Sequence, residues 1–246
     1  METSLDARRR AASRWWHGTV AAVVLVALLI QFALVLTGGQ DANSGDRAEQ
    51  AGLAVRLWRF FSYFTVESNI VVVVVSALLA IDPLRRGAWW EIARLYSLLA
   101  ITITGVVFAL VLAPQLELEG WSSVASFGLH TVSPVLTVVG WLVFGPRRRF
   151  RWSTVAGAFA VAAVWLLYIF GQGSITHWYP YPFLDAAHLG IIPAVVNALL
   201  VVAVAAVLAV VIRAVDRAVP AMLRENGPNA AGSGTAASSG SLNSRG

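Results

Sequence analysis

The chain contains six apolar runs, each long enough to cross a lipid bilayer as a helix. Crossing about 30 Å of hydrocarbon takes about 20 residues at a rise of about 1.5 Å per residue. Strands of a membrane β-barrel would be shorter and would alternate apolar with polar residues. The pattern therefore predicts an all-α, polytopic bundle of six transmembrane helices. The expected spans are Thr19 to Thr37, Leu57 to Ile81, Ile92 to Ala113, Ser122 to Phe144, Ser153 to Gly171 and Gly190 to Ile212.

The composition excludes other classes of protein. Of the 246 residues, 58% are hydrophobic and 13% are charged, whereas soluble domains carry about 25% charged residues. A soluble globular domain and a disordered protein are both excluded. Because the chain has no cysteine, disulfides, thiolate metal sites and cysteine nucleophiles are excluded as well. No metal and no organic cofactor is implied.

The distribution of basic residues predicts the orientation. All eighteen are arginines. Fourteen of them fall in the N-terminal segment, between spans two and three, between spans four and five, or after span six, and a fifteenth on the same side, Arg94, lies at the start of span three. Only Arg47, Arg56 and Arg59 fall on the other side. Cytoplasmic loops of membrane proteins carry an excess of basic residues. We therefore expect both termini in the cytoplasm and the protein in the plasma membrane. We interpret the arginines as determinants of the topology, and we expect no nucleic acid as a partner.

This orientation divides the chain into three parts. Residues 1–16 form a basic cytoplasmic segment, residues 17–213 form the transmembrane domain, and residues 214–246 form a cytoplasmic tail. From about Glu225 onward the tail consists of Gly, Ser, Asn and Ala with almost no large apolar residue. Such a composition predicts disorder.

Polar residues within the spans indicate a candidate pocket, since polar groups in lipid are costly and commonly mark a site. At about 100° per residue, two spans each carry one polar stripe. Helical rise places Thr65 and His130 at a similar depth, roughly 12 Å from the outer side, with Thr104 and Asn197 near the same level. We expect one shared pocket in the outer leaflet. The stripes are Trp58, Ser62, Thr65, Ser68, Asn69 and Ser76 in the second span, and Ser126, His130, Ser133 and Thr137 in the fourth.

The segment between the last two spans is also unusual. Residues 172–189 are rich in aromatic residues and proline, which suits a rigid cap over the pocket. His177, Asp185 and His188 lie here without regular spacing or a fourth ligand, so no metal site is assigned.

Ordinary explanations compete with a site. Serine and threonine in membrane helices often bond their own backbone carbonyls, Asn197 could simply join two helices, and His130 could be a structural donor. A threonine hydroxyl beside a histidine is also the minimum set for nucleophilic acyl transfer, in which the histidine takes the hydroxyl proton.

Several short motifs carry a resemblance to a known family. In order along the chain they are Tyr63-Phe64-Thr65, Gly120-Trp121, His130-Thr131 with Pro134, and Trp178 with Tyr181-Pro182-Phe183-Leu184. From about residue 15 to residue 212 the chain resembles the androgen-induced-gene-type membrane proteins, which are threonine hydrolases of fatty acid esters of hydroxy fatty acids. The run from Phe64 to Asn69 is more similar still to their bacterial relatives, a family of proline-rich six-transmembrane proteins.

The resemblance implies roles for individual residues. It makes Thr65 the nucleophile and His130 its base. Three positions after the threonine, where the family has an acidic residue, this chain has Ser68.

Two functions follow as hypotheses. The first is an intramembrane hydrolase of fatty acyl esters, with a membrane lipid or acyl ester as its substrate. Thr65 and His130 would be catalytic, and the pocket residues would bind the substrate. The alternative is a lipid or small-solute binding or transport protein without catalysis. The candidate substrate-binding residues are Ser68, Asn69, Ser133, Asn197 and Tyr181.

Overall fold

Six helical segments are long and apolar enough to cross a membrane. The computed structural model describes residues 4–45, 51–220 and 222–223. The predicted all-α polytopic bundle is confirmed, and the chain is an integral membrane protein. The spans are α1 (Ser4–Thr37), α3 (Phe64–Ile81), α4 and its continuation (Ala88–Gln115), α5 through α6 (Gly120–Phe144), α7 (Trp152–Thr176) and α9 (Ile191–Ala218).

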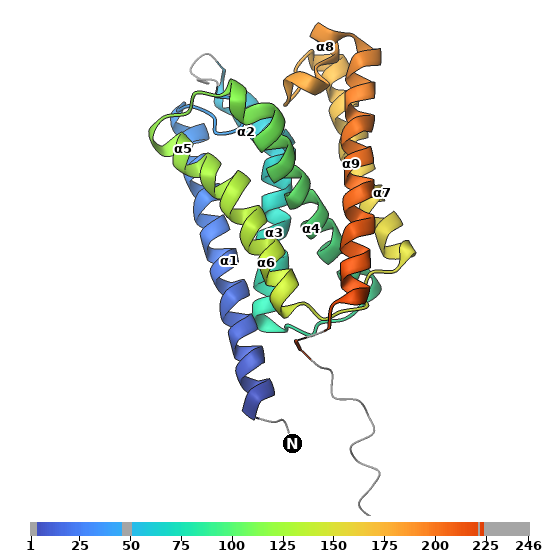
Figure 1. Cartoon of the computed structure of the whole chain (residues 1–246). Coiled ribbons are helices and arrows are strands. Elements are labelled where there is room, and N and C mark those ends of the chain that lie inside the picture. Colours follow the sequence, from blue (N-terminus) through green and yellow to red (C-terminus); the bar gives the residue numbers. More distant parts are fainter. Residues whose placement is uncertain (1–3, 46–50, 221, 224–246) are drawn as a thin grey trace, which may run out of the picture.

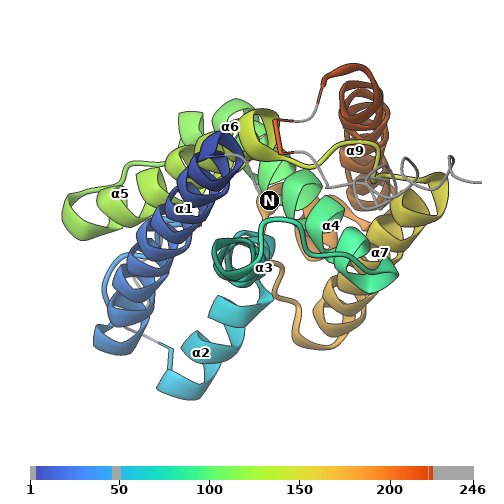
Figure 2. The ribbon, with the colours of Figure 1, turned by 90° about the horizontal axis from the view of Figure 1, so that it is seen from below.

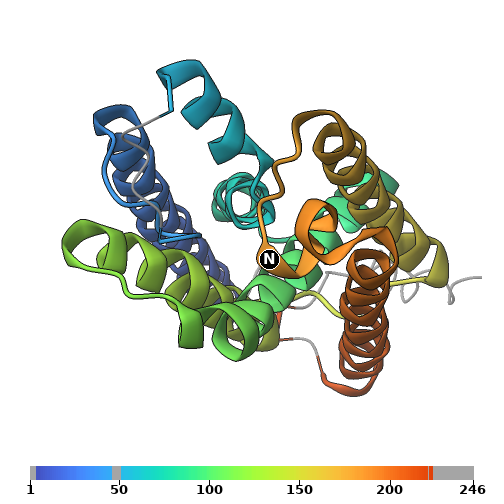
Figure 3. The same cartoon turned by 90° about the horizontal axis from the view of Figure 1, so that it is seen from above.

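The helices form two groups around α4. One group contains α1, α3 and the α5–α6 span, which pack against one another. The other contains α7 and α9, which pack against α4 on the side away from α1 (Figures 1 and 3). Helix α4 therefore packs against both groups.

The first and last helices, α1 and α9, extend beyond the boundaries expected from the sequence. Helix α1 already begins at Ser4, so arginines of the expected N-terminal segment lie on the helix, and Arg14 donates from Nε to the carbonyl of Ala80 (2.9 Å). Helix α9 continues to Ala218, five residues into the expected tail. The predicted disorder of residues 225–246 falls outside the described residues.

The expected second span is interrupted at Tyr63. Helix α2 (Leu53–Ser62) ends there, the backbone of Tyr63 is extended (φ −70°, ψ 128°), and α3 begins at Phe64. Neighbouring groups satisfy the interrupted backbone: Trp165 Nε1 donates to the carbonyl of Ser62 (3.2 Å), and the carbonyl of Tyr63 accepts from the amides of Val66 and Glu67. Tertiary contacts therefore stabilise a break that no proline or glycine marks.

Two spans contain a short π-helical segment. Phe108–Leu112 (η2) follows α4 (Ala88–Val107) and leads into a 3₁₀ turn, Ala113–Gln115 (η3). Gly128–Val132 (η4) lies between α5 (Gly120–Phe127) and α6 (Ser133–Phe144). Such wide turns shift the register of a helix and recur at functional sites. The two remaining short helices, Pro182–Leu184 (η5) and Ala186–Leu189 (α8), belong to the segment between α7 and α9.

A glycine sets how closely α1 approaches η4. A Cβ atom at Gly128 would lie 2.6 Å from Cβ of Ala27. Close backbone approach through small residues is typical of helix contacts in membranes.

We predict that Gly128→Leu lowers the free energy of unfolding by about 1–3 kcal/mol, because the leucine side chain separates α1 from η4. The melting temperature should fall accordingly. The matched control is Gly171→Leu on α7, where a Cβ meets no atom within 4 Å. Thermal unfolding in detergent, followed by tryptophan fluorescence, measures both. Equal melting temperatures for the two variants would contradict the close contact.

Candidate functional site

The polar stripes of the second and fourth spans meet at Thr65 and His130. Oγ1 of Thr65 lies 3.2 Å from Nε2 of His130, and each residue is 3% exposed. Thr65 lies in the first turn of α3 and His130 in the π-helical segment η4. A hydroxyl and an imidazole are thus within hydrogen-bond distance in a buried setting.

The other ring nitrogen determines how His130 can act. Nδ1 lies 3.0 Å from the carbonyl oxygen of Ser126 and 3.1 Å from its Oγ. Since a carbonyl only accepts, this contact favours the tautomer with the proton on Nδ1. Nε2 is then an acceptor for the Thr65 hydroxyl. Phe108 of η2 stacks on the imidazole at 3.8 Å between centroids, which fixes the plane of the ring.

Tyr181 closes the site from the segment between α7 and α9. Its hydroxyl accepts from the amide of Thr65 (3.1 Å) and lies 3.3 Å from Oγ1 of the same residue. Burial raises the pKa of Tyr181 to about 12, so the phenol keeps its proton at neutral pH. Because the oxygen accepts from the amide, that proton remains available to an acceptor beside Thr65.

Ser68 and Asn69 hold the backbone of Thr65. Ser68 Oγ donates to the Thr65 carbonyl (3.1 Å), and Nδ2 of Asn69 donates to the same carbonyl (2.8 Å). Ser68 also contacts Oγ1 of Thr104 on α4 at 3.1 Å. Both side chains are fully buried behind Thr65, where they position it.

The two other candidate substrate-binding residues lie apart from Thr65. Asn197 of α9 donates from Nδ2 to the carbonyl of Phe183 (2.9 Å), and so joins α9 to η5. Oγ of Ser133 is buried without a hydrogen-bond partner among the described residues. The structure therefore brings Thr65, His130, Tyr181, Ser68 and Asn69 together, whereas Asn197 and Ser133 make no hydrogen bond to them among the described residues.

A cavity of about 110 Å³ lies beside Thr65. Its polar edge consists of Thr65, Thr104 and Tyr181. From there it follows α4, α7 and α9, and on α9 its lining runs from Ala198 to Ala205, about 10 Å by helical rise. Almost all the rest of the wall is apolar. The shape and chemistry fit a hydrocarbon chain with one polar end.

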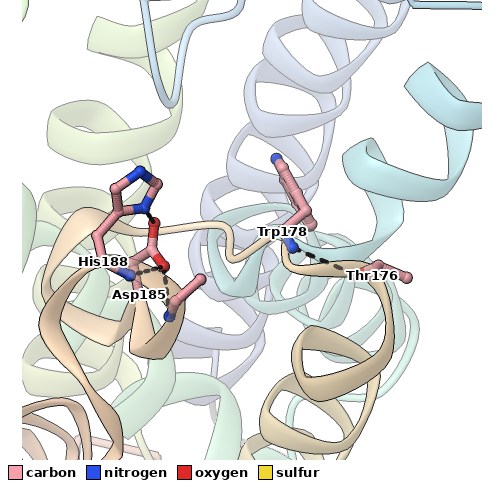
Figure 4. Close-up of polar contacts among 5 residues, drawn as sticks. Thr176, Trp178, Asp185 and His188 are labelled. Carbon is pink, nitrogen blue, oxygen red and sulfur yellow. Dashed lines mark hydrogen bonds and ion pairs between the residues drawn. The ribbon is translucent and has the colours of Figure 1, made fainter.

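The segment after α7 forms the cap predicted from the sequence. Thr176 Oγ1 accepts from the amide of Trp178 (3.3 Å) at the turn that ends α7. Asp185 caps α8 by accepting from the amides of Ala187 and His188, and its Oδ2 lies 2.6 Å from Nδ1 of His188 (Figure 4). Asp185 and His188 therefore stabilise the cap, and Tyr181 reaches inward from it.

Some contacts had no signal in the sequence. Phe108 is an apolar residue in an apolar span, so nothing in the sequence distinguishes it as the residue that stacks on His130. Glu67 accepts from the hydroxyl of Tyr96 on α4 at 3.0 Å, a contact between residues far apart in the sequence.

We predict that His130 carries its proton on Nδ1. In protein labelled with ¹⁵N-histidine, the resonance lost in His130→Gln should show a protonated Nδ1 and an unprotonated Nε2 at neutral pH. His188→Gln, which removes an exposed histidine, identifies a second resonance as the control. A proton found on Nε2 of His130 would contradict the orientation given by Ser126.

Comparison with known proteins gives no relative. No family model matches the chain, and neither a curated protein nor a solved structure matches it.

Proposed function

We propose that this membrane protein hydrolyses fatty acyl esters, with Thr65 as nucleophile and His130 as general base. The observation that carries the proposal is the 3.2 Å contact between Thr65 Oγ1 and His130 Nε2, in which Thr65 also lines an apolar cavity. A nucleophile, a base and a group that orients the base are the parts that acyl transfer needs. Ser126 supplies the orienting carbonyl.

The reaction has two halves. The Thr65 hydroxyl transfers its proton to Nε2 of His130 while Oγ1 attacks the ester carbonyl. The tetrahedral intermediate then expels the alcohol, which takes the proton from His130, and leaves an acyl-threonine. Water, deprotonated by His130, attacks this ester. Collapse of the second intermediate releases the fatty acid and restores Thr65.

The surroundings of Thr65 favour the negative charge that develops on the carbonyl oxygen. Thr65 lies at the N-terminus of α3, where the helix dipole is positive. Two donors lie at the edge of the cavity, the hydroxyls of Tyr181 and Thr104. Fixed donors act strongly where water is excluded. Tyr181 is thus better placed for this role than Ser68, Asn69 or Asn197, whose side chains bond backbone carbonyls.

The cavity supports an acyl chain as the substrate part that is bound. Phe159, Leu166 and Val201 are among its apolar walls, and the alanines Ala158 and Ala205 leave room at the end away from Thr65. A chain lying here would present its ester carbonyl to Thr65. The bilayer, in our proposal the plasma membrane, supplies such substrates directly.

Hydrolysis of fatty acyl esters by the purified protein tests the proposal. We predict that Thr65→Ala and His130→Gln each lower kcat by at least about 10²-fold, the range typical of a lost nucleophile or base. Thr102→Ala is the matched control, because Thr102 bonds the carbonyl of Leu98 in its own helix. This variant should retain wild-type activity.

The outcomes separate the two hypotheses. Full activity in Thr65→Ala and His130→Gln would overturn the mechanism. Saturable binding of a lipid without turnover by the folded wild-type protein would favour the binding or transport protein instead.

A further inference from the structure

A second group of buried polar side chains lies at the opposite end of the bundle from Thr65. Its members lie on four helices, α1, α3, α4 and α6, which Figure 2 shows from the end where α1 begins. On α3, Ser76 of this group is eleven residues from Thr65, about 16 Å by helical rise. The group surrounds a cavity of about 20 Å³ and is separate from the candidate ester site. Its polar members are His17, Ser76, Arg94, Ser97, Thr137 and Trp141.

Three of these groups have no hydrogen-bond partner among the described residues. Oγ of Ser97, Oγ1 of Thr137 and Nε1 of Trp141 are buried without a hydrogen bond to any described residue. Buried polar atoms in native proteins nearly always have a partner. Three such atoms on two helices around one cavity therefore indicate a shared ligand.

Arg94 adds a positive charge to the same cavity. Arg94 lines the cavity, and the residue is 7% exposed. A Cβ at Gly145 would lie 3.1 Å from its Nη2 atom. Burying a guanidinium is costly unless opposite charge and hydrogen bonds compensate for the lost water.

Two carboxylates near Arg94 also contact other groups. Asp216 Oδ2 accepts from the amides of Arg149 and Phe150 (2.8 and 3.1 Å), whereas its Oδ1 is buried without a hydrogen-bond partner among the described residues. Glu91 pairs with Arg149 at 3.7 Å. The guanidiniums of Arg147 and Arg149 also act on Arg94, so the region around the cavity stays positive.

We propose that this cavity binds a halide ion, with chloride as the physiological ligand. The Arg94 guanidinium, the indole N–H of Trp141 and the hydroxyls of Thr137 and Ser97 are all able to donate to one anion. A cavity of about 20 Å³ accommodates a single atom of this size or one water molecule. Phosphates and carboxylates are larger. The bound halide joins α4 and α6 and so stabilises the fold.

The thermal stability of the purified protein in detergent tests this proposal. At constant ionic strength, replacing sodium gluconate with sodium chloride or bromide should raise the melting temperature saturably. The expected rise is about 3–6 °C when the halide reaches about ten times its Kd. Broadening of the ³⁵Cl resonance by the protein reports binding directly. Gluconate is too large for the cavity.

Variants locate the binding site. Arg94→Gln should abolish the halide dependence, and Arg217→Gln, at an exposed arginine near the same end, should keep it. Thr137→Val removes one hydroxyl donor with little change in volume, and Trp141→Phe removes the indole N–H together with part of the ring. Each should weaken halide binding about 5- to 10-fold, and these two carry the test if Arg94→Gln does not fold.

Two results would overturn the proposal. One is a wild-type melting temperature that is the same in chloride and gluconate, together with no ³⁵Cl broadening, as expected if the cavity holds water. The other is a halide dependence unchanged in Thr137→Val and Trp141→Phe, which would place the ion elsewhere.

Discussion

The extended backbone at Tyr63 is the constraint on which the candidate site depends. It ends α2 and starts α3 at Phe64, so that Thr65 lies in the first turn of a helix rather than in its middle. The amide of Thr65 then has no carbonyl of its own helix to bond and donates to Tyr181 instead. One local break thus sets the position of Thr65 at the positive end of the α3 dipole and its bond to Tyr181 of the cap.

The burial of polar groups in the bundle links the remaining parts of the site. Polar atoms within the membrane must find partners in the protein, and Ser126, His130, Thr65 and Tyr181 form one continuous series of contacts. Hydrogen bonds in such low-dielectric surroundings are stronger and hold their geometry. The π-helical segments contribute because one carries His130 and the other carries the Phe108 ring stacked on it. Rigid positioning around Thr65 is the result.

Simple periodicity predicts much of this arrangement and fails at identifiable places. The number of spans follows from the lengths of the apolar runs. The polar stripes predict that Thr65 and His130 face one pocket, and helical rise places them at a similar depth. Regular rise and rotation cannot show the break at Tyr63, which depends on Trp165 and the cap. Nor can they show the π-helical turn around His130. Asn197, at the expected depth, bonds Phe183 because the cap reaches into the bundle.

The central claim is that Thr65 is a nucleophile activated by His130, and covalent labelling tests it most directly. The folded protein is treated with a phosphonate probe for serine and threonine hydrolases, and the modified peptide is identified by mass spectrometry. We predict an adduct on Thr65 in the wild-type protein, and its loss in His130→Gln at an unchanged melting temperature. An unlabelled Thr65, or labelling that is equally strong in His130→Gln, would contradict the account.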